Sequence, residues 1–126
     1  MIMIKGIHHI SMKCRESELE EVLHFYLDIL GMTIKRKWSA GVMIDTGAGL
    51  LEVFSTGDGE SGKGSLRHIA FAVDSVDEVI SRVKESGYEV FVEPTDKVMD
   101  STPAFPFRMA FCYGPLGEEV EFFEEK

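Results

Sequence analysis

Two histidines and two glutamates occupy matched places in the two halves of this chain, and all four carry side chains that bind divalent metals. His9 and His68 each lie in an alternating, strand-like stretch, "HHISMKC" and "LRHIAFAVD". Each is followed two residues later by a small residue, Ser11 or Ala70, so the face of the strand that carries the histidine has room for a ligand. One such histidine would most simply be a hydrogen-bonded structural residue, but the repeat makes a shared role worth considering.

The glutamates lie in the last strand-like stretch of each half. Glu52 is in "LLEVF" and Glu121 is in "EEVEFFE", each between two bulky apolar residues. A carboxylate among apolar neighbours is costly unless it is paired or bound to a cation. The resulting set of two nitrogen and two oxygen ligands suits nickel, zinc, cobalt, manganese or ferrous iron.

The helices expected to position these residues also occur twice in the sequence. Ser17 and Glu20 form an S-x-x-E capping box, and Ser75 and Glu78 form another. An apolar stripe of helical spacing follows each box, and a glycine ends each helix, at Gly31 and at position 87. The first predicted stripe consists of Leu19, Val22, Leu23, Tyr26, Leu27 and Leu30. The second consists of Val76, Val79, Ile80 and Val83.

Alternating stretches before and after each predicted helix indicate one strand before it and three after it. We therefore predict an α+β protein of two tandem βαβββ modules in a single domain over residues 1–126. Module 1 spans about residues 5–55, a Gly/Ser-rich linker spans 56–65, and module 2 spans about 66–126. Residues 93–106 contain three prolines and are expected to form a long loop that covers a site.

Alternation along the first strand also separates the two adjacent histidines. His8 falls on the face that carries Ile10 and Met12, which is the face suited to packing against a helix. We therefore expect His8 to be structural, and His9 on the opposite face to bind the metal.

The amino-acid composition of the chain argues against some classes of binding partner. The formal net charge of −9 disfavours nucleic acid, because an acidic chain repels phosphate backbones. The apolar runs are too short to cross a bilayer, and the first residues lack the long apolar segment of a signal peptide. We expect a cytoplasmic protein with a small-molecule substrate and no membrane partner.

With these residues in view, the chain resembles the vicinal oxygen chelate superfamily and, within it, glyoxalase I (lactoylglutathione lyase). The resemblance covers nearly the whole chain, through "HISMKC", "FYLDILGM", "LLEVF", "RHIAFAVDSVDEV" and "GPLGEEVEFFE". His9, Glu52, His68 and Glu121 match the four metal ligands of the family. The resemblance also implies that the modules curl into a cupped mixed sheet, and that the protein is a homodimer.

The chemistry implied by the resemblance is an isomerisation through an enediolate. A 2-oxoaldehyde thiol adduct would become a 2-hydroxyacyl thioester, with Glu121 the first choice as catalytic base and Glu52 mainly a ligand, although the repeat allows the roles to swap. Lys13, Lys97 and Arg108 are the candidates for holding an anionic part of the substrate. Bacterial glyoxalase I has an arginine at Lys13 and an asparagine at Thr56, so the identity of the thiol stays open.

Three alternatives remain at this stage. An extradiol-type dioxygenase would use two histidines and one carboxylate, and Glu52 argues against it because it adds a fourth protein ligand. An acyl-CoA epimerase would use the same proton transfer on another substrate. A metal-free drug-binding resistance protein would leave the matched histidines and glutamates unexplained.

Overall fold

The computed structural model describes residues 7–59 and 68–126. The chain divides into two compact units, unit 1 (Met1–Glu60) and unit 2 (Ser61–Lys126), which are described separately below. From residue 60 onward, the predicted linker over 56–65 lies outside the described residues.

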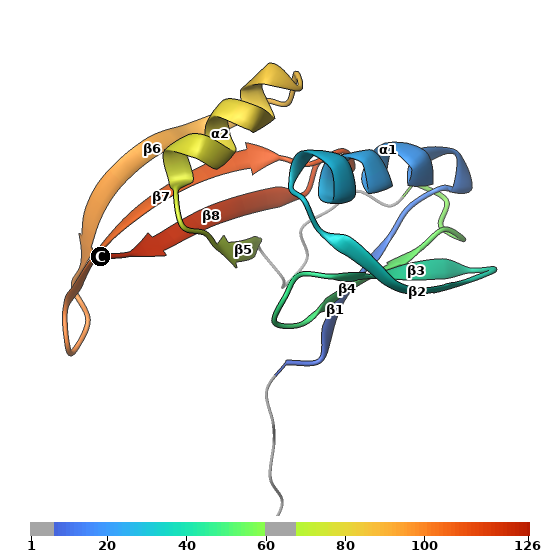
Figure 1. The fold of residues 1–126 in the computed structure, drawn as a ribbon, viewed down its shortest axis with the longest axis horizontal. Helices are drawn as coiled ribbons and strands as arrows, with labels where there is room; N and C mark the ends of the chain where they lie inside the picture. Colours follow the sequence, from blue (N-terminus) through green and yellow to red (C-terminus); the bar gives the residue numbers. More distant parts are fainter. Residues whose placement is uncertain (1–6, 60–67) are drawn as a thin grey trace, which may run out of the picture. The chain divides into compact units, whose positions relative to one another are not determined.

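Unit 1 is a four-stranded mixed sheet with one helical segment. Its strands are β1 (His9–Lys13), β2 (Thr33–Trp38), β3 (Gly41–Asp45) and β4 (Leu50–Phe54), and they lie in the order β1-β4-β3-β2. β1 pairs with β4 in parallel, and the other neighbours are antiparallel. Between β1 and β2 the chain forms a short 3₁₀ turn (Glu16–Glu18), α1 (Leu19–Leu23) and a π-helical segment (His24–Ile29). Figure 1 shows α1 running over one face of this sheet.

The start of the first helix differs from the prediction. The helical segment begins before Ser17, and the capping contact runs from the Arg15 backbone N–H to the Glu18 carboxylate at 2.8 Å. The predicted Ser17–Glu20 capping box is therefore wrong by two residues. The glutamate-rich run offers several acidic side chains at this terminus, and spacing alone does not choose among them.

The buried side of this helix also differs from the predicted stripe. Val22 and Tyr26 are buried as expected, but Phe25 and Ile29 are buried too, whereas Leu23 and Leu27 are only half-buried. The physical reason is the π-helical segment, which has more residues per turn than an α-helix and rotates the later side chains around the axis.

Unit 2 repeats the same topology. Its strands are β5 (Ile69–Ala72), β6 (Val90–Met99), β7 (Phe105–Tyr113) and β8 (Glu119–Glu125), in the order β5-β8-β7-β6, with β5 and β8 parallel. Helix α2 (Val76–Glu85) lies over one face of the sheet (Figure 1). Its cap is as predicted, because the Ser75 hydroxyl accepts a hydrogen bond from the Glu78 N–H at 3.2 Å. Gly87, at a φ of 86°, follows the helix end in the left-handed region that glycine favours.

The loop expected over residues 93–106 is a β-hairpin instead. β6 continues to Met99 and β7 begins at Phe105, so the connection is short. Pro94 lies within β6 where the pairing with β7 is irregular, between Val92 and Thr95. A proline can occupy an edge strand at such a bulge, because no ladder hydrogen bond is required of it there.

Each sheet has one face that packs into a core and one more open face. On the core face the buried strand side chains of unit 1 are Val42, Ile44, Leu51 and Val53. In unit 2 they are Ala110, Cys112, Val120 and Phe122, with α2 contributing Val76, Ile80 and Val83. Phe107, Met109 and Glu121 are buried on the other face of the unit 2 sheet. The predicted α+β class and the tandem βαβββ order are confirmed. Among the described residues, no helix is both long and apolar enough to span a bilayer.

Candidate metal and substrate site

The first histidine–glutamate pair is created by the parallel pairing of β1 with β4. Ser11 lies opposite Glu52 in this pairing, and His9 lies two residues before Ser11, on the same face. The His9 Nε2 and the Glu52 Oε1 are 3.5 Å apart. The histidine side chain is more exposed than the carboxylate, which is flanked on its own face by half-buried Leu50 and Phe54.

Unit 2 builds the second pair in the same way. Ala70 lies opposite Glu121, and His68 lies two residues before Ala70. The His68 Nε2 and the Glu121 Oε1 are 3.2 Å apart. Glu121 is buried, and this burial raises the pKa of its carboxyl group, an effect that neighbouring His68 partly offsets.

The separation within each pair fits an imidazole–carboxylate ion pair and is also compatible with two neighbouring ligands of one metal ion. Ligands at about 2.0–2.2 Å from a metal, at angles near 90–110°, lie about 3 Å from one another, close to both measured separations. The paired atoms are an imidazole nitrogen and a carboxylate oxygen, the donors suited to borderline divalent metals. Each pair supplies two ligands, and within residues 7–59 and 68–126 no three or more histidine, cysteine or acidic side chains gather around one point.

His8 does not lie in the core. It is exposed, and its Nδ1 is 2.9 Å from the Nδ1 of His9, with the two rings edge to face. His8 lies just before β1, where strand alternation no longer applies, so its predicted core-facing position is wrong. If His9 donates from Nδ1 to His8, the Nε2 of His9 is left unprotonated, which is the state that binds a metal.

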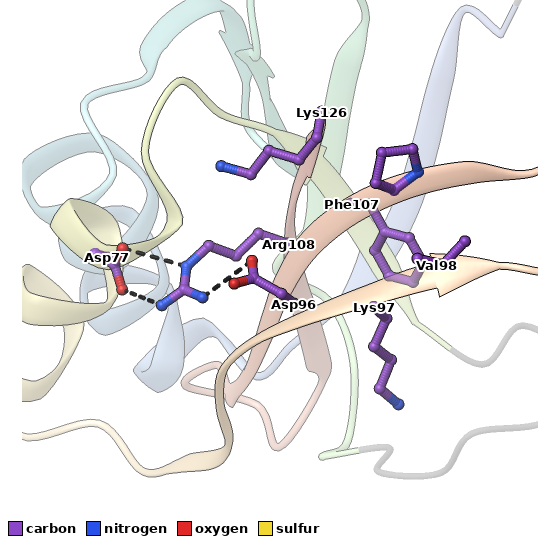
Figure 2. A pocket seen from close by; sticks show the side chains of 8 residues that line it. Asp77, Asp96, Lys97, Val98, Phe107, Arg108 and Lys126 are labelled. Carbon is purple, nitrogen blue, oxygen red and sulfur yellow. Dashed lines mark hydrogen bonds and ion pairs between the residues drawn. The ribbon is translucent and has the colours of Figure 1, made fainter.

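The three predicted anion-binding residues lie in different settings. Lys13 ends β1 on the same face as His9, and its side chain is exposed. Lys97 of β6 pairs with Phe107 of β7, which by alternation shares the face of Phe111 and Glu121. Figure 2 shows the Lys97 ammonium pointing away from the Arg108 ion pairs.

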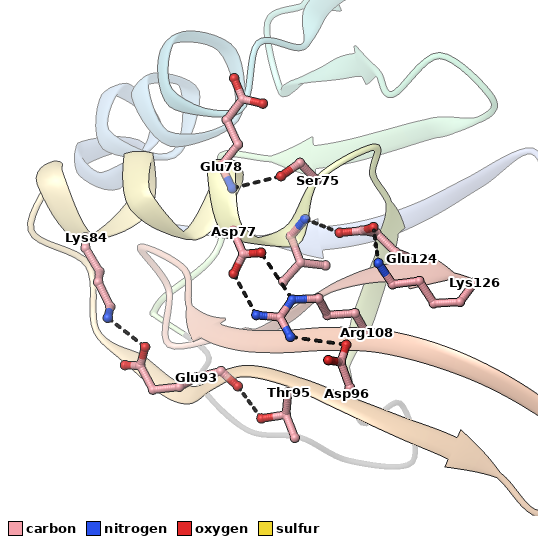
Figure 3. Close-up of polar contacts among 11 residues, drawn as sticks. Ser75, Asp77, Glu78, Lys84, Glu93, Thr95, Asp96, Arg108, Glu124 and Lys126 are labelled. Atoms are coloured by element: carbon pink, nitrogen blue, oxygen red, sulfur yellow. Dashed lines mark hydrogen bonds and ion pairs between the residues drawn. The ribbon is translucent and has the colours of Figure 1, made fainter.

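Arg108 is on the other side of its sheet. Its position in β7 puts it on the face that packs against α2, opposite to the face of Glu121. It donates two hydrogen bonds to Asp77 at 2.8 and 3.2 Å, and its third nitrogen lies 3.1 Å from Asp96 (Figures 2 and 3). These contacts raise the pKa of Arg108 and tie α2 to the β6–β7 hairpin. Arg108 is therefore not brought together with His68 and Glu121.

An open hollow of about 680 Å³ surrounds Arg108, between α2 and the hairpin (Figure 2). Neither His68 nor Glu121 lines it. Because its arginine is already paired with two aspartates, this hollow offers less chemistry than the histidine–glutamate pairs.

Sequence reasoning missed the aromatic surroundings of Glu121. Phe111 lies directly opposite Glu121 in the β7–β8 pairing, and its ring centroid is 5.2 Å from that of His68. The alternation of "FRMAFCY" could have placed Phe111 on an open face, but only the strand register shows which glutamate it faces.

The chain belongs to the Glyoxalase/Bleomycin resistance protein/Dioxygenase superfamily, whose family model matches residues 6–122. It is 28% identical over 136 residues to YwkD of Bacillus subtilis, an uncharacterized protein, covering 98% of this chain and all of the relative.

Solved structures show the same fold. A glyoxalase family protein from Enterococcus faecalis is 27% identical, with a TM-score of 0.72 over 95% of this chain and 98% of that one. A lactoylglutathione lyase from Agrobacterium tumefaciens is 18% identical, with a TM-score of 0.67 over 96% and 94%. The second likeness supports the fold alone.

Proposed function

We propose that this protein is a metal-dependent lyase or isomerase of the glyoxalase I type. In this proposal His9, Glu52, His68 and Glu121 jointly hold one divalent ion, which is nickel, zinc, cobalt, manganese or iron. The substrate is a 2-oxoaldehyde thiol adduct, and the product is a 2-hydroxyacyl thioester formed through an enediolate.

The observation that carries the proposal is the equivalence of the two pairs. In each unit the glutamate faces a small residue across a parallel strand pair, and the histidine lies two residues before that small residue. The repeated topology accounts for the shared register, and a common ligand accounts for the same two side-chain types in both registers. A single ion drawing on both pairs accounts for the match and for the cost of placing carboxylates beside apolar side chains.

The reaction needs a base that removes a proton from one carbon and returns it to the adjacent carbon. We assign this role to Glu121, because burial raises the pKa of its carboxyl group and so makes the carboxylate a stronger base. Glu52 acts mainly as a ligand. When bound, the ion polarises the carbonyl and stabilises the negative charge that develops on oxygen. Lys13 and Lys97 are proposed to attract an anionic part of the substrate.

We also propose that the two units complete one domain, and that the protein is a homodimer. The family relationship supports both proposals, and family members that dimerise can complete sites across chains. Light scattering should give twice the 14.1 kDa chain mass at micromolar concentration. A monomer mass under these conditions would remove the dimer from the proposal.

Metal titration tests the site directly. Wild-type protein purified without chelators should bind one ion per chain, and His68→Ala should lose binding or weaken it strongly. His24→Ala is the matched control, because His24 is an exposed histidine paired with Asp28 on the π-helical segment. Unchanged affinity and stoichiometry in His68→Ala would rule out the proposed ligand set.

Turnover tests the reaction. Protein loaded with nickel, cobalt or zinc should form a thioester from methylglyoxal and a thiol, measured by absorbance. Glutathione and other abundant thiols should be compared, because Lys13 and Thr56 replace residues expected to contact glutathione. Absence of thioester with every thiol and every metal would contradict the glyoxalase assignment.

A further inference from the structure

The face of the unit 2 sheet that carries Glu121 has two groups of contacting aromatic rings, together called the aromatic face below. Phe107 and Phe123 stack with centroids 4.8 Å apart, and Phe91 stacks on Tyr113 at 4.3 Å. Phe91 also contacts Phe111 at 5.4 Å. The members of the aromatic face are Phe91, Phe105, Phe107, Phe111, Tyr113 and Phe123.

These rings are not part of the core between the sheet and α2. That core uses the opposite side chains of the same strands, including Ala110, Cys112 and Phe122, all fully buried. On the aromatic face Phe111 and Phe123 are half-buried, whereas Phe107 is buried. Unit 2 thus has two apolar faces, and only one of them packs against its helix.

The aromatic face surrounds the proposed catalytic pair. Phe111 lies opposite Glu121, and its ring meets the His68 ring edge to face. Phe123 lies two residues beyond Glu121 and faces Ala72 across the parallel pairing. A group held beside Glu121 would therefore contact aromatic rings on one side and small alanine side chains on the other.

The matching positions of unit 1 are different in kind. Met43 lies opposite Glu52, where unit 2 has Phe111. Lys13 faces Phe54, where unit 2 has Ala72 facing Phe123. Unit 1 keeps one aromatic pair on this face, because Phe54, at the position of Phe123, has its ring 5.7 Å from that of Trp38. What distinguishes unit 2 is the aromatic residue directly opposite its glutamate.

We infer that the aromatic face binds an aryl or bulky apolar substituent of the 2-oxoaldehyde, so that the preferred substrate class is aryl or large-alkyl glyoxals rather than methylglyoxal. The inference rests on the proposed function, because it concerns the same site. Ring stacking and loss of apolar surface from water supply the selectivity.

Kinetic competition between two substrates measures the preference for an aryl over a methyl substituent. The kcat/KM for the phenylglyoxal adduct should exceed that for the methylglyoxal adduct of the same thiol by about 10- to 100-fold, by analogy with discrimination in apolar pockets. Phe111→Ala should bring the ratio close to one, and Phe111→Leu should restore part of it. Met43→Ala, at the equivalent position of unit 1, should leave the ratio unchanged.

Binding of the 2-hydroxy acids that correspond to the acyl groups of the two products separates this inference from the proposed function. Mandelate and lactate differ only in a phenyl or methyl group and require no turnover, so calorimetry on metal-loaded protein compares the groups directly. Tighter binding of mandelate that is lost in Phe111→Ala would support the aromatic face, even if neither glyoxal turned over and the glyoxalase assignment failed. Turnover without an aryl preference, together with equal binding of the two acids, would overturn the inference and leave the proposed function standing.

Discussion

Units 1 and 2 share a backbone plan and differ in what their open faces present. Both place a histidine, a small residue and a glutamate in the same parallel register. Around this set unit 1 has Lys13 and Met43, whereas unit 2 has Ala72 and Phe111. The comparison teaches that strand pairing fixes where ligands lie, while the neighbouring side chains decide what each face can bind.

The two glutamates illustrate the same difference. Both carboxylates are mostly covered, at 13% and 11% side-chain exposure, so burial alone hardly separates them. Glu121 lies opposite an aromatic ring, and desolvation by burial raises the pKa of its carboxyl group. In the proposed function Glu121 is the base and Glu52 is mainly a ligand, so the two glutamates have unequal roles.

Matched substitutions of the two glutamates should show this inequality most strongly. Glu121→Gln keeps an oxygen ligand and removes the base, so metal binding should largely persist while kcat falls by about 10²- to 10⁴-fold. Glu52→Gln should reduce kcat less. Both variants should be assayed at full metal loading, with bound metal measured in the same samples.

Two outcomes would contradict this assignment. Wild-type turnover by Glu121→Gln would show that Glu121 is not the base. A larger loss in Glu52→Gln would reverse the roles of the two units.

Truncating one buried side chain in each unit compares how much the two cores contribute to the stability of the protein. Phe122 is buried against Phe71, and Val53 is the equivalent residue of unit 1. Phe122→Ala should lower the free energy of unfolding by about 3–5 kcal/mol. Val53→Ala removes less apolar volume and should cost about 1.5–3 kcal/mol. Urea unfolding monitored by circular dichroism measures both, and a larger cost at Val53 would contradict the comparison.

The repeated βαβββ order can be predicted from the sequence alone, because alternation and helical spacing are local signals that occur twice. The α2 cap at Ser75 and the four strands of each unit follow from such signals. The pairing of Ser11 with Glu52 could not be predicted in this way, since it depends on register between distant strands.

Other features depend on details that a pattern does not contain. The π-helical segment rotates Phe25 and Ile29 into the buried side, against the predicted stripe. Three prolines predict a loop over residues 93–106, but this segment belongs to the β6–β7 hairpin, where Pro94 lies at a bulge. The charge of Arg108 predicts a contact with an anionic substrate, but its ion pairs with Asp77 and Asp96 depend on strand and helix packing that the sequence pattern does not contain.

The contact between His8 and His9 has no described counterpart in unit 2. It therefore offers a further test of how the two histidine–glutamate pairs differ. If His8 holds His9 with its Nε2 available, His8→Ala should weaken metal binding by about tenfold, as outer-shell partners of metal-binding histidines do. Competition titration with a chromophoric chelator measures the affinity. Ile7→Ala, at an exposed neighbouring residue, is the control. Wild-type affinity in His8→Ala would mean that the contact has no positioning role.

The smallest effect concerns α2. Glu124 accepts a hydrogen bond from the Val76 N–H at the start of α2, and this contact lowers the pKa of Glu124 (Figure 3). A lowered folded-state pKa stabilises the protein above the ordinary value of 4.5, and the stabilisation disappears as pH falls through the lowered value. Glu124→Gln should therefore lower Tm at pH 7 and lose this effect in acid, whereas Glu125→Gln should not. A Tm difference independent of pH would contradict the capping role.

X-ray absorption spectroscopy of protein loaded with excess zinc or nickel, and then freed of unbound metal, tests the central claim, that one ion draws on both units. The spectrum should show two imidazole nitrogens and carboxylate oxygens at about 2.0–2.2 Å, with one ion per chain. His9→Ala and His68→Ala should each remove one imidazole from that spectrum. A spectrum with a single imidazole, together with two ions bound per chain, would show that each unit holds its own metal and would contradict the shared site.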